Sequence, residues 1–376
     1  MQKIKVLEFF GEPLNYGGQE AFIINVYSKI NKDKFDFTFM TPFECENIKL
    51  KDMISNNNDK LIFCNKEFNS NMRKRYIVET AKKYLNGNDY DVIHIHSGSV
   101  FTLYNVAKIA KKSGIKKVIV HSHCTGINSI KYRIIKFISD RFIDKYVDLY
   151  FACSKDAGMW KFPKRIVNSD KFYVIKNGID TNKYIFNEDI RQNYRKDYNL
   201  ENKHIICAIG RYDIQKNPIF TLNVFSEYLK MDKDGFLIMI GGSWDLENDI
   251  NTYIKSSNLS NYVLILKNRD DIPALLNMSD VYIMPSLWEG LGIAAIEAQA
   301  SGLPTLCSEN IPNEAFITEL AMKFELSNGE KKWAEKINEL INIKRKNTSE
   351  FIVKSGFDIN ESVKIIEKNY CKECEK

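Results

Sequence analysis

Short runs of β-branched and aromatic residues alternate with amphipathic stretches of helical length along almost the whole chain. This alternation limits the fold strongly, because strands that alternate with helices favour parallel sheets with helices on both faces. In the first half, the runs that predict strands are 4–10, 35–40, 60–63, 92–96, 118–122, 149–153 and 172–175. In the second half, they are 204–210, 236–241, 263–266, 281–285 and 304–307. We therefore expect an α/β protein with two doubly wound, Rossmann-like parallel sheets in series.

The length of 376 residues is suited to two domains, because one domain usually takes about 100–200 residues. The polar stretch 183–201 follows the last strand of the first half and precedes the first strand of the second, so we interpret it as the linker. The first domain is then expected at 1–185 and the second from 186 onward. Ligands of such folds bind beyond the carboxyl ends of the strands, so we expect the two domains to face each other across a cleft.

Composition excludes several classes of protein. With 44% hydrophobic and 27% charged residues, the chain is not a collagen, a disulfide-framed miniprotein or a mainly disordered protein. No apolar run reaches the ~18 residues of a membrane span, and Glu8 interrupts the apolar N-terminal stretch, so we expect neither a span nor a signal peptide. The eight cysteines are then expected as reduced thiols in the cytoplasm. We interpret the Cys-x-x-Cys pair of Cys371 and Cys374 as part of a polar tail rather than a zinc or redox site.

The net charge of +6 is unevenly distributed. Residues 1–185 hold 31 Lys and Arg against 19 Asp and Glu, whereas residues 186–376 hold 23 against 29. A basic half usually indicates an anionic partner, which could be nucleic acid, an anionic membrane surface or a phosphorylated substrate. A lysine-rich surface that is merely solvated is an equally good interpretation from charge alone.

The segment 285–304 carries the most informative pattern. A strand end leads into a loop with Glu289, Gly290 and Gly292, and then into a helix that contains Glu297. Glycines let backbone N–H groups approach a ligand closely, and a helix start favours anions. The two carboxylates, eight positions apart, could hold different parts of one extended polyol. The alternative is a plain amphipathic helix with one solvated glutamate.

The Glu-x7-Glu spacing of Glu289 and Glu297 resembles the most specific motif of the retaining glycosyltransferases of family 4, which have the GT-B fold. The resemblance covers almost the whole chain in the family's order. Its other parts are Asn15-Tyr-Gly-Gly-Gln-Glu20, Asp91-Val-Ile-His-Ile-His96, His121-Ser-His123, Ile175-Lys-Asn-Gly-Ile-Asp180 and Gly210-Arg-x4-Lys216-Asn-Pro218. The final stretch, 356–376, is similar to the C-terminal segment that crosses back onto the first domain in this fold, which leaves 186–355 for the second.

The resemblance implies a role for each matching position. Arg211 and Lys216, just after a strand end, would neutralise the diphosphate of the leaving group. Glu297 would bind the ribose hydroxyls, and Glu289 the hydroxyls of the donor sugar. The other donor-binding positions expected are Gly17, Gly18, Asn177, Gly210, Gly290, Gly292 and Ile293. The alternatives are a solvated charge pair beside Asp213 for the two cations and a purely structural turn for the first two glycines.

Four of the five histidines form two strand-end pairs, His94 with His96 and His121 with His123. Side chains alternate along a strand, so the members of each pair share one face. The sequence shows no third metal ligand at a useful spacing and the resembling fold works without a bound metal, so we expect no metal. The resemblance brings His121 or His123 near the donor sugar, and His123, which is nearer the loop, is preferred; His94 is expected in the core. The expected catalytic residues are His123, Arg211, Lys216 and Glu289.

The resemblance thus predicts a retaining hexosyltransferase. It would move a hexose or N-acetylhexosamine from a nucleotide sugar, expected to be a UDP-sugar, to a hydroxyl of a growing glycan in capsule or exopolysaccharide synthesis. No cofactor is expected besides the donor substrate, and no nucleic acid partner. Two alternatives are a sugar-nucleotide epimerase on the same fold and a non-catalytic sugar-nucleotide-binding partner of another transferase.

The stretch 130–145 bears on where the acceptor would lie. Its basic residues alternate with Ile, Phe and Tyr at roughly helical spacing; they are Lys131, Arg133, Lys136, Arg141 and Lys145. A basic amphipathic helix can rest on an anionic bilayer. Together with a lipid-pyrophosphate-linked glycan acceptor, this predicts a peripheral contact at the inner face of the plasma membrane. The alternative is an ordinary helix that packs on the first sheet.

Overall fold

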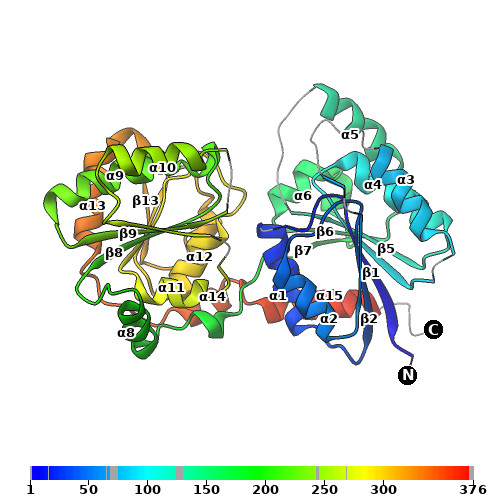
Figure 1. The fold of residues 1–376 in the computed structure, drawn as a ribbon. Helices are drawn as coiled ribbons and strands as arrows, with labels where there is room; N and C mark the ends of the chain where they lie inside the picture. Colours follow the sequence, from blue (N-terminus) through cyan, green and yellow to red (C-terminus); the bar gives the residue numbers. More distant parts are fainter. Residues whose placement is uncertain are drawn as a thin grey trace. The chain divides into compact units, whose positions relative to one another are not determined.

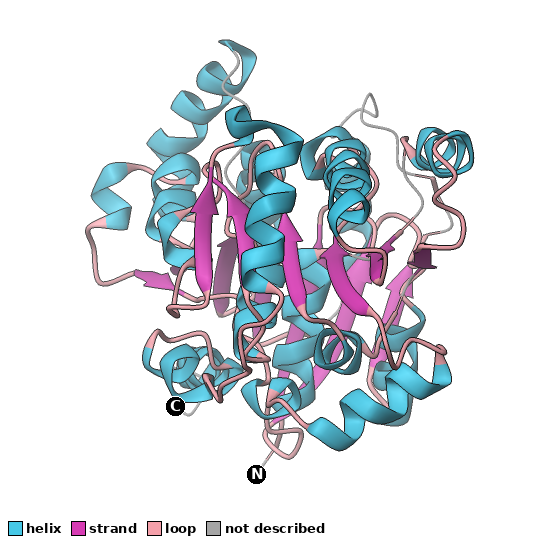
Figure 2. Ribbon diagram, turned by 90° about the vertical axis from the view of Figure 1, so that its left-hand side faces the viewer, coloured by secondary structure: helices cyan, strands magenta, loops and turns pink. Residues whose placement is uncertain are grey.

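The computed structural model describes residues 2–15, 17–64, 66–67, 75–87, 89–123, 130–242, 245–267 and 269–371, without the side chains of 130–134 and 138. Cys374 and the side chains of Lys131 and Arg133 therefore lie outside the described part. The chain forms two compact units: unit 1 is Met1–Gly178 with Ile359–Lys376, and unit 2 is Ile179–Asp358 (Figure 1). In each unit a parallel sheet lies between layers of helices (Figure 2), so the expected α/β, doubly wound architecture is confirmed.

Unit 1 contains a seven-stranded parallel sheet in the order β3-β2-β1-β4-β5-β6-β7. Its strands are β1 (Ile4–Phe10), β2 (Phe35–Thr41), β3 (Lys60–Phe63), β4 (Val92–His96), β5 (Lys117–Ser122), β6 (Leu149–Ala152) and β7 (Phe172–Val174). The strand order reverses direction between β1 and β4, and the carboxyl ends at such a switch point are the usual ligand site of a doubly wound fold.

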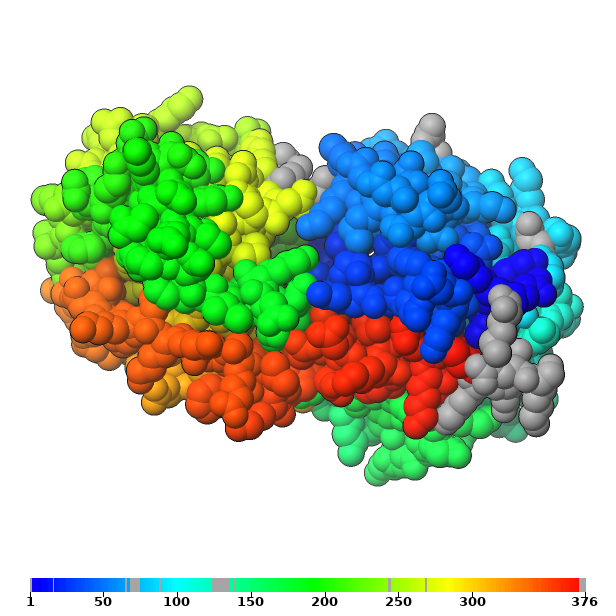
Figure 3. Space-filling view, turned by 90° about the horizontal axis from the view of Figure 1, so that it is seen from below, coloured from blue at the N-terminus to red at the C-terminus, as the bar shows by residue number. Residues whose placement is uncertain are grey.

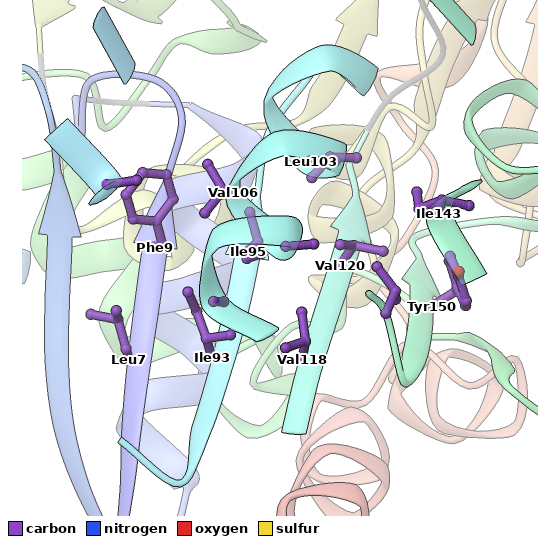
Figure 4. Close-up of a cluster of buried hydrophobic side chains, with 14 of the residues drawn as sticks. Leu7, Phe9, Ile93, Ile95, Leu103, Val106, Val118, Val120, Ile143 and Tyr150 are labelled. Carbon is purple, nitrogen blue, oxygen red and sulfur yellow. The ribbon is translucent and has the colours of Figure 1, made fainter. Parts of the chain in front are cut away.

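The two faces of this sheet are covered by different helices. Leu7 and Phe9 of β1 point to one face, where they belong to the same buried cluster as Leu103 and Val106 of α4 (Figure 4). Val6 lies on the opposite face, with α1, α2 and α15. The helices of unit 1 are α1 (Gly18–Lys29), α2 (Ile48–Asn56), α3 (Arg75–Leu85), α4 (Val100–Lys112), α5 (Ile130–Phe142), α6 (Lys155–Lys161), α7 (Lys164–Val167) and α15 (Ile359–Cys371). Burial on both faces explains why the strands read as nearly continuous apolar runs.

Unit 2 contains a six-stranded parallel sheet in the order β10-β9-β8-β11-β12-β13. Its strands are β8 (His204–Ile209), β9 (Gly235–Gly241), β10 (Val263–Lys267), β11 (Val281–Met284), β12 (Thr305–Ser308) and β13 (Ala321–Phe324). Its helices are α8 (Glu188–Asp197), α9 (Pro218–Met231), α10 (Glu247–Ser256), α11 (Ile272–Met278), α12 (Ile293–Ala300), α13 (Gly329–Leu340) and α14 (Ser349–Lys354). Here the switch point lies between β8 and β11.

The stretch 183–201 is not a linker along its length, contrary to our expectation. It contains helix α8, which packs on α11 within unit 2. Arg191 and Arg195 of α8 both form ion pairs with Asp280, the latter at 2.6 Å between Nη2 and Oδ2. The polar composition of this stretch therefore reflects paired charges. The units divide after Gly178 and after Asp358, against the expected divisions after 185 and 355.

Helix α15 belongs to unit 1, although unit 2 separates it from the rest of that unit in the sequence. It packs against α1, and Figure 3 shows the two segments side by side in red and blue. Val363, Ile366 and Tyr370 are buried in the core of unit 1, and the ammonium of Lys117 donates to the Asn369 carbonyl at 2.7 Å. In the part of the chain that the structure describes, no helix has the length and apolar character needed to cross a membrane.

Candidate active site

The loop after β8 brings Arg211 and Lys216 to the carboxyl edge of the sheet in unit 2. Asp213 starts a short 3₁₀ turn there, because its carboxylate accepts a hydrogen bond from the Lys216 amide at 3.0 Å. Asn217 follows in the left-handed conformation, with φ of 54°, and α9 begins at the next residue. Asn tolerates this conformation better than most residues, so the local sequence fixes the backbone that carries Lys216.

Gln215 joins this loop to the loop after β11. Its carbonyl accepts from the Leu287 amide at 2.8 Å, and its side-chain amide donates to the Trp288 carbonyl at 2.9 Å. The same side-chain amide lies 3.4 Å from Oε2 of Glu289. The two loops are therefore held together by three contacts of one residue.

Lys216 and Glu289 form an ion pair between these loops, with 2.5 Å between Nζ and Oε1. Only 7% of the Glu289 side chain is exposed, so removing Lys216 would leave a buried carboxyl group without its partner. Arg211 lies beside the pair, with Nη2 3.1 Å from Asp213 and 3.2 Å from the oxygen of Gln215. The structure thus brings Arg211, Lys216 and Glu289 together, and the alternative of a pair with Asp213 holds for Arg211 but not for Lys216.

A pocket opens beside these side chains at the carboxyl ends of β8 and β11; it is lined by Ala208, Ile209, Gly210, Arg211, Tyr212, Lys216, Pro218, Thr221, Met239, Ile283, Met284, Pro285 and Ser286. Gly210 lies under the Lys216 side chain, since a Cβ added there would be 2.9 Å from Cδ of the lysine. Gly290 faces open space, which leaves its backbone approachable. Gly292 has φ of +86°, a conformation that favours glycine, and caps the start of α12.

Glu297 lies on α12 and accepts a hydrogen bond of 2.6 Å from the Tyr184 hydroxyl. Burial raises the pKa of this carboxyl to about 7, and the hydrogen bond from Tyr184 opposes the shift. Helix α12 begins at Ile293 without a side-chain cap, so the first backbone N–H groups remain suited to an anion. The two glutamates therefore have different surroundings, as expected if they hold different parts of a ligand.

Three of the expected donor-binding residues lie in unit 1. Gly17 is extended, with φ of −166°, and α1 begins at Gly18 without a side-chain cap. Neither glycine has a positive φ, and a Cβ on Gly18 would meet nothing within 4 Å. Asn177 follows β7, and its Oδ1 is buried with no hydrogen-bond partner in the described part of the chain. The binding of the donor substrate by these three residues remains a prediction.

The four histidines of unit 1 form one connected network with Glu8. His96 Nε2 lies 2.7 Å from the Glu8 carboxylate, and His96 Nδ1 lies 2.8 Å from Nε2 of His123. His94 Nε2 lies 3.2 Å from Nδ1 of His121. His94 is buried, as expected, but it is a member of a polar network rather than of an apolar core.

Our argument that no third metal ligand exists is wrong for the folded chain. Ring nitrogens of His94, His96 and His121 lie within 4.8 Å of one another, because neighbouring parallel strands bring the two pairs together. Both nitrogens of His94 and of His96 already have hydrogen-bond partners, which a metal ion would have to displace. The absence of a metal stays a prediction.

Comparison with known families shows to which family this chain belongs. Residues 16–183 match the family model described as Glycosyltransferase Family 4, and residues 190–355 match the one described as Glycosyl transferases group 1. The two matches together span most of both units. The chain belongs to glycosyltransferase family 4.

Individual relatives agree with this membership. EpsF of Bacillus subtilis (strain 168) is 26% identical over 93% of this family 4 chain and 92% of its own length. The UDP-Gal:alpha-D-GlcNAc-diphosphoundecaprenol alpha-1,3-galactosyltransferase of Escherichia coli is 28% identical over 84% of this chain and 78% of its own. Among solved structures, Anabaena HepE in complex with UDP and glucose superposes with a TM-score of 0.72 at 17% identity, covering 97% of this chain and 99% of HepE. A glycosyltransferase from Rickettsia africae gives 0.69 at 18% identity, covering 98% of both chains, so the GT-B fold is confirmed.

Sequence reasoning missed Glu8, Gln215 and Tyr184. Glu8 could have been found, because an isolated acidic residue inside an apolar strand needs a buried partner. Tyr184 and Gln215 carry no such signal, since their partners lie far away in the sequence.

Proposed function

We propose that this chain is a retaining glycosyltransferase that moves a hexose or N-acetylhexosamine from a UDP-sugar to a hydroxyl of a growing cell-surface glycan. The observation that carries the proposal is the Lys216–Glu289 ion pair beside Arg211, at the edge where doubly wound folds bind ligands. A glycosyltransferase that uses a nucleoside-diphosphate sugar must bind a diphosphate and a sugar side by side, and this site offers two cations next to a buried carboxylate.

The proposed donor placement follows from these charges. Arg211 and Lys216 would meet the diphosphate and stabilise the charge that grows on it as the glycosidic bond breaks. Glu289 would hold hydroxyls of the sugar, and Glu297 the ribose hydroxyls. The oxygens of Glu289 are already held by Lys216 and Gln215, which suits a hydroxyl ligand better than a nucleophile. We therefore favour same-face substitution, in which the leaving phosphate takes the acceptor proton, over a covalent glycosyl-enzyme.

The relatives support a nucleotide-sugar donor without fixing the nucleotide. One is named for transfer from UDP-galactose to a sugar on diphosphoundecaprenol, and another for transfer from GDP-mannose to a cellobiosyl-diphosphopolyprenol. Solved neighbours hold UDP with glucose or with GlcNAc. A UDP-sugar and a lipid-pyrophosphate-linked acceptor are the pair that this set favours.

An acceptor on a lipid carrier would be met at a membrane surface. On α5, the side chain of Phe137 is 71% exposed and Arg141 is exposed. Lys145, in the short 3₁₀ turn that follows the helix, is exposed as well. Lys136, in contrast, is paired with Asp140 at 2.9 Å and is engaged in the fold. Peripheral docking of α5 on anionic lipid would therefore involve the exposed residues rather than Lys136.

A thermal-shift panel with UDP-, GDP-, ADP- and dTDP-sugars tests the donor assignment. A ligand at 100 times its dissociation constant stabilises by about 2.7 kcal/mol, which shifts the melting temperature measurably. We expect UDP-sugars to give the largest shift, and no shift with any of the four would refute the proposed function. Incubation of the best donor without acceptor separates the epimerase alternative, because an epimerase converts the donor alone. The anomeric configuration of the transferred sugar, measured by NMR, tests retention.

A further inference from the structure

Glu8 is a charged residue in the middle of β1, 5% exposed, and the proposed donor site gives it no direct role. Each of its two oxygens has a partner: His96 Nε2 lies 2.7 Å from Oε2, and the Tyr370 hydroxyl donates to Oε1 at 2.7 Å. Burial alone would raise the pKa of Glu8, but the attraction of His94 and hydrogen bonds from His94 and His96 hold it well below its usual range. Glu8 is therefore a buried carboxylate that can only accept hydrogen bonds.

This acceptor decides where the protons of the next two histidines lie. Because a carboxylate has no proton to donate, His96 must carry its proton on Nε2. Burial, followed by repulsion from His94, lowers the pKa of His96 to about 4, so His96 is neutral near pH 7 and its Nδ1 is an acceptor. The contact of 2.8 Å between His96 Nδ1 and His123 Nε2 then requires that His123 donates from Nε2.

The proton on Nε2 leaves the other nitrogen of His123 without one. Burial and repulsion from His96 keep the pKa of His123 well below its usual value, so this ring is also neutral. Its Nδ1 is buried and has no hydrogen-bond partner in the described part of the chain. The ring stands just beyond the carboxyl end of β5, at the edge of the sheet where doubly wound folds bind ligands.

We propose that Glu8 is a positioning residue that acts through His96 to hold His123 as the Nε2–H tautomer, so that the Nδ1 lone pair accepts a hydrogen bond from a hydroxyl of the donor sugar. The sugar contact rests on the proposed function, whereas the relay from Glu8 to His123 rests on the network alone. The carboxylate does not touch the sugar. It determines which kind of hydrogen bond His123 can make.

A second arm leads from Glu8 through Tyr370 to His94 and His121. The Tyr370 oxygen lies 2.6 Å from Nδ1 of His94, whose Nε2 meets Nδ1 of His121. The other nitrogen of His121, Nε2, is buried and unpartnered within the described residues. Exchanging donors and acceptors along either arm would leave an unpaired N–H on a buried nitrogen, which costs about 1–3 kcal/mol. His121 is fully buried, however, whereas His123 is partly exposed, so a small movement of the His123 ring can bring its N–H to water and lower this cost.

The tautomer can be measured without any substrate. Neutral imidazole nitrogens that carry a proton and those that do not have well-separated ¹⁵N shifts, and the chain has five histidines, so each ring can be assigned by substitution. In the wild-type protein near neutral pH, we expect His123 to be protonated on Nε2 and unprotonated on Nδ1. A proton on Nδ1, or a doubly protonated ring, would overturn the proposal.

Glu8→Gln tests the relay itself. A carboxamide has one accepting oxygen where the carboxylate has two, while both neighbours of Glu8 donate. The donor and acceptor roles must therefore be exchanged along one of the two arms, which we call reversal of that arm. The cost argued above favours reversal of the His96 arm, which would move the proton of His123 to Nδ1. Tyr370→Phe is the matched control, because it removes a contact to the same carboxylate but leaves the His96 arm in place. An unchanged His123 tautomer in Glu8→Gln, or the same reversal in Tyr370→Phe, would refute the relay.

The functional consequence is measured separately. In Glu8→Gln we expect kcat/KM for the sugar donor to fall about tenfold, the scale of one hydrogen bond, while the affinity for UDP alone stays within about twofold. Equal losses for UDP and for the donor would indicate a merely structural role. If the wild-type protein turns over no nucleotide sugar, the proposed function fails, and the tautomer of His123 still decides the relay.

Discussion

The stability of unit 2 in a Glu297→Gln variant should increase relative to the wild type as the pH rises. Burial raises the pKa of this carboxyl from its usual 4.5 to about 7. Between these values the folded state keeps a proton that the unfolded chain has lost, so the free energy of unfolding falls with rising pH through this window and stays lowered above it. At about 1.36 kcal/mol per pH unit, the loss comes to about 3 kcal/mol. The Gln variant cannot ionise and escapes this loss, while its amide oxygen still accepts from Tyr184.

Urea unfolding of both proteins at about pH 5 and about pH 8 checks this expectation. The stability of Glu297→Gln relative to wild type should increase by about 2–3 kcal/mol between the two conditions. Glu335→Gln, on the exposed side of α13, is the control and should show no such change. A difference between Glu297→Gln and wild type that is the same at both pH values would refute the reasoning.

The same group should couple nucleotide binding to pH. If ribose hydroxyls donate to Glu297, UDP favours the ionised carboxylate, and its binding must release the proton below about pH 7. The affinity of the wild-type protein for UDP should therefore rise with pH through this window, by up to about tenfold per pH unit. Calorimetry in buffers of different ionisation enthalpy would detect the released proton. Glu297→Gln should bind UDP more weakly and without this dependence.

Three further outcomes are expected. Arg211→Ala and Lys216→Ala should each lower turnover by about 10²–10³ with an unchanged circular dichroism spectrum, and activity within a few-fold of wild type for both would place the diphosphate elsewhere. Glu289→Gln should spare the affinity for UDP but lower sugar transfer by about 10², and a parallel loss of both would contradict its assignment to the sugar. The wild-type protein should sediment with anionic but not with neutral vesicles, and the bound fraction should fall at high salt and in the Phe137→Ser, Arg141→Glu variant. Equal sedimentation with both vesicle types would refute the proposed membrane contact.

The sequence predicted the elements whose pattern is local. The strand at 92–96 lies where its β-branched run indicates, because both faces of a central parallel strand are buried. Strand β13 was missed, since it is an edge strand in which Met322 and Lys323 are exposed and the apolar pattern is weak. The polar stretch around α8 was misinterpreted, because the ion pairs that fold it join residues about 85 positions apart.

The candidate site was predictable only in part for the same reason. The Glu-x7-Glu spacing marks Glu289 and Glu297 as candidate residues from the sequence alone, but it does not reveal their partners Lys216 and Tyr184. The histidine pairs were visible, yet the network needs Glu8 from another strand. Residue types and local spacing can be read from one sequence, whereas contacts between distant segments depend on which strands become neighbours in the sheet.

The placement of α15 has a consequence for how the protein is made. The ribosome completes all of unit 2 before it synthesises the helix that supplies Val363, Ile366 and Tyr370 to the core of unit 1. Until then the nascent unit 1 exposes the apolar surface that α15 will cover, and Glu8 lacks its Tyr370 partner. Unit 2 can reach its native state first, although it is encoded second. A nascent chain that stalls before residue 359 would therefore carry one finished domain and one open apolar face, a target for chaperones and proteases.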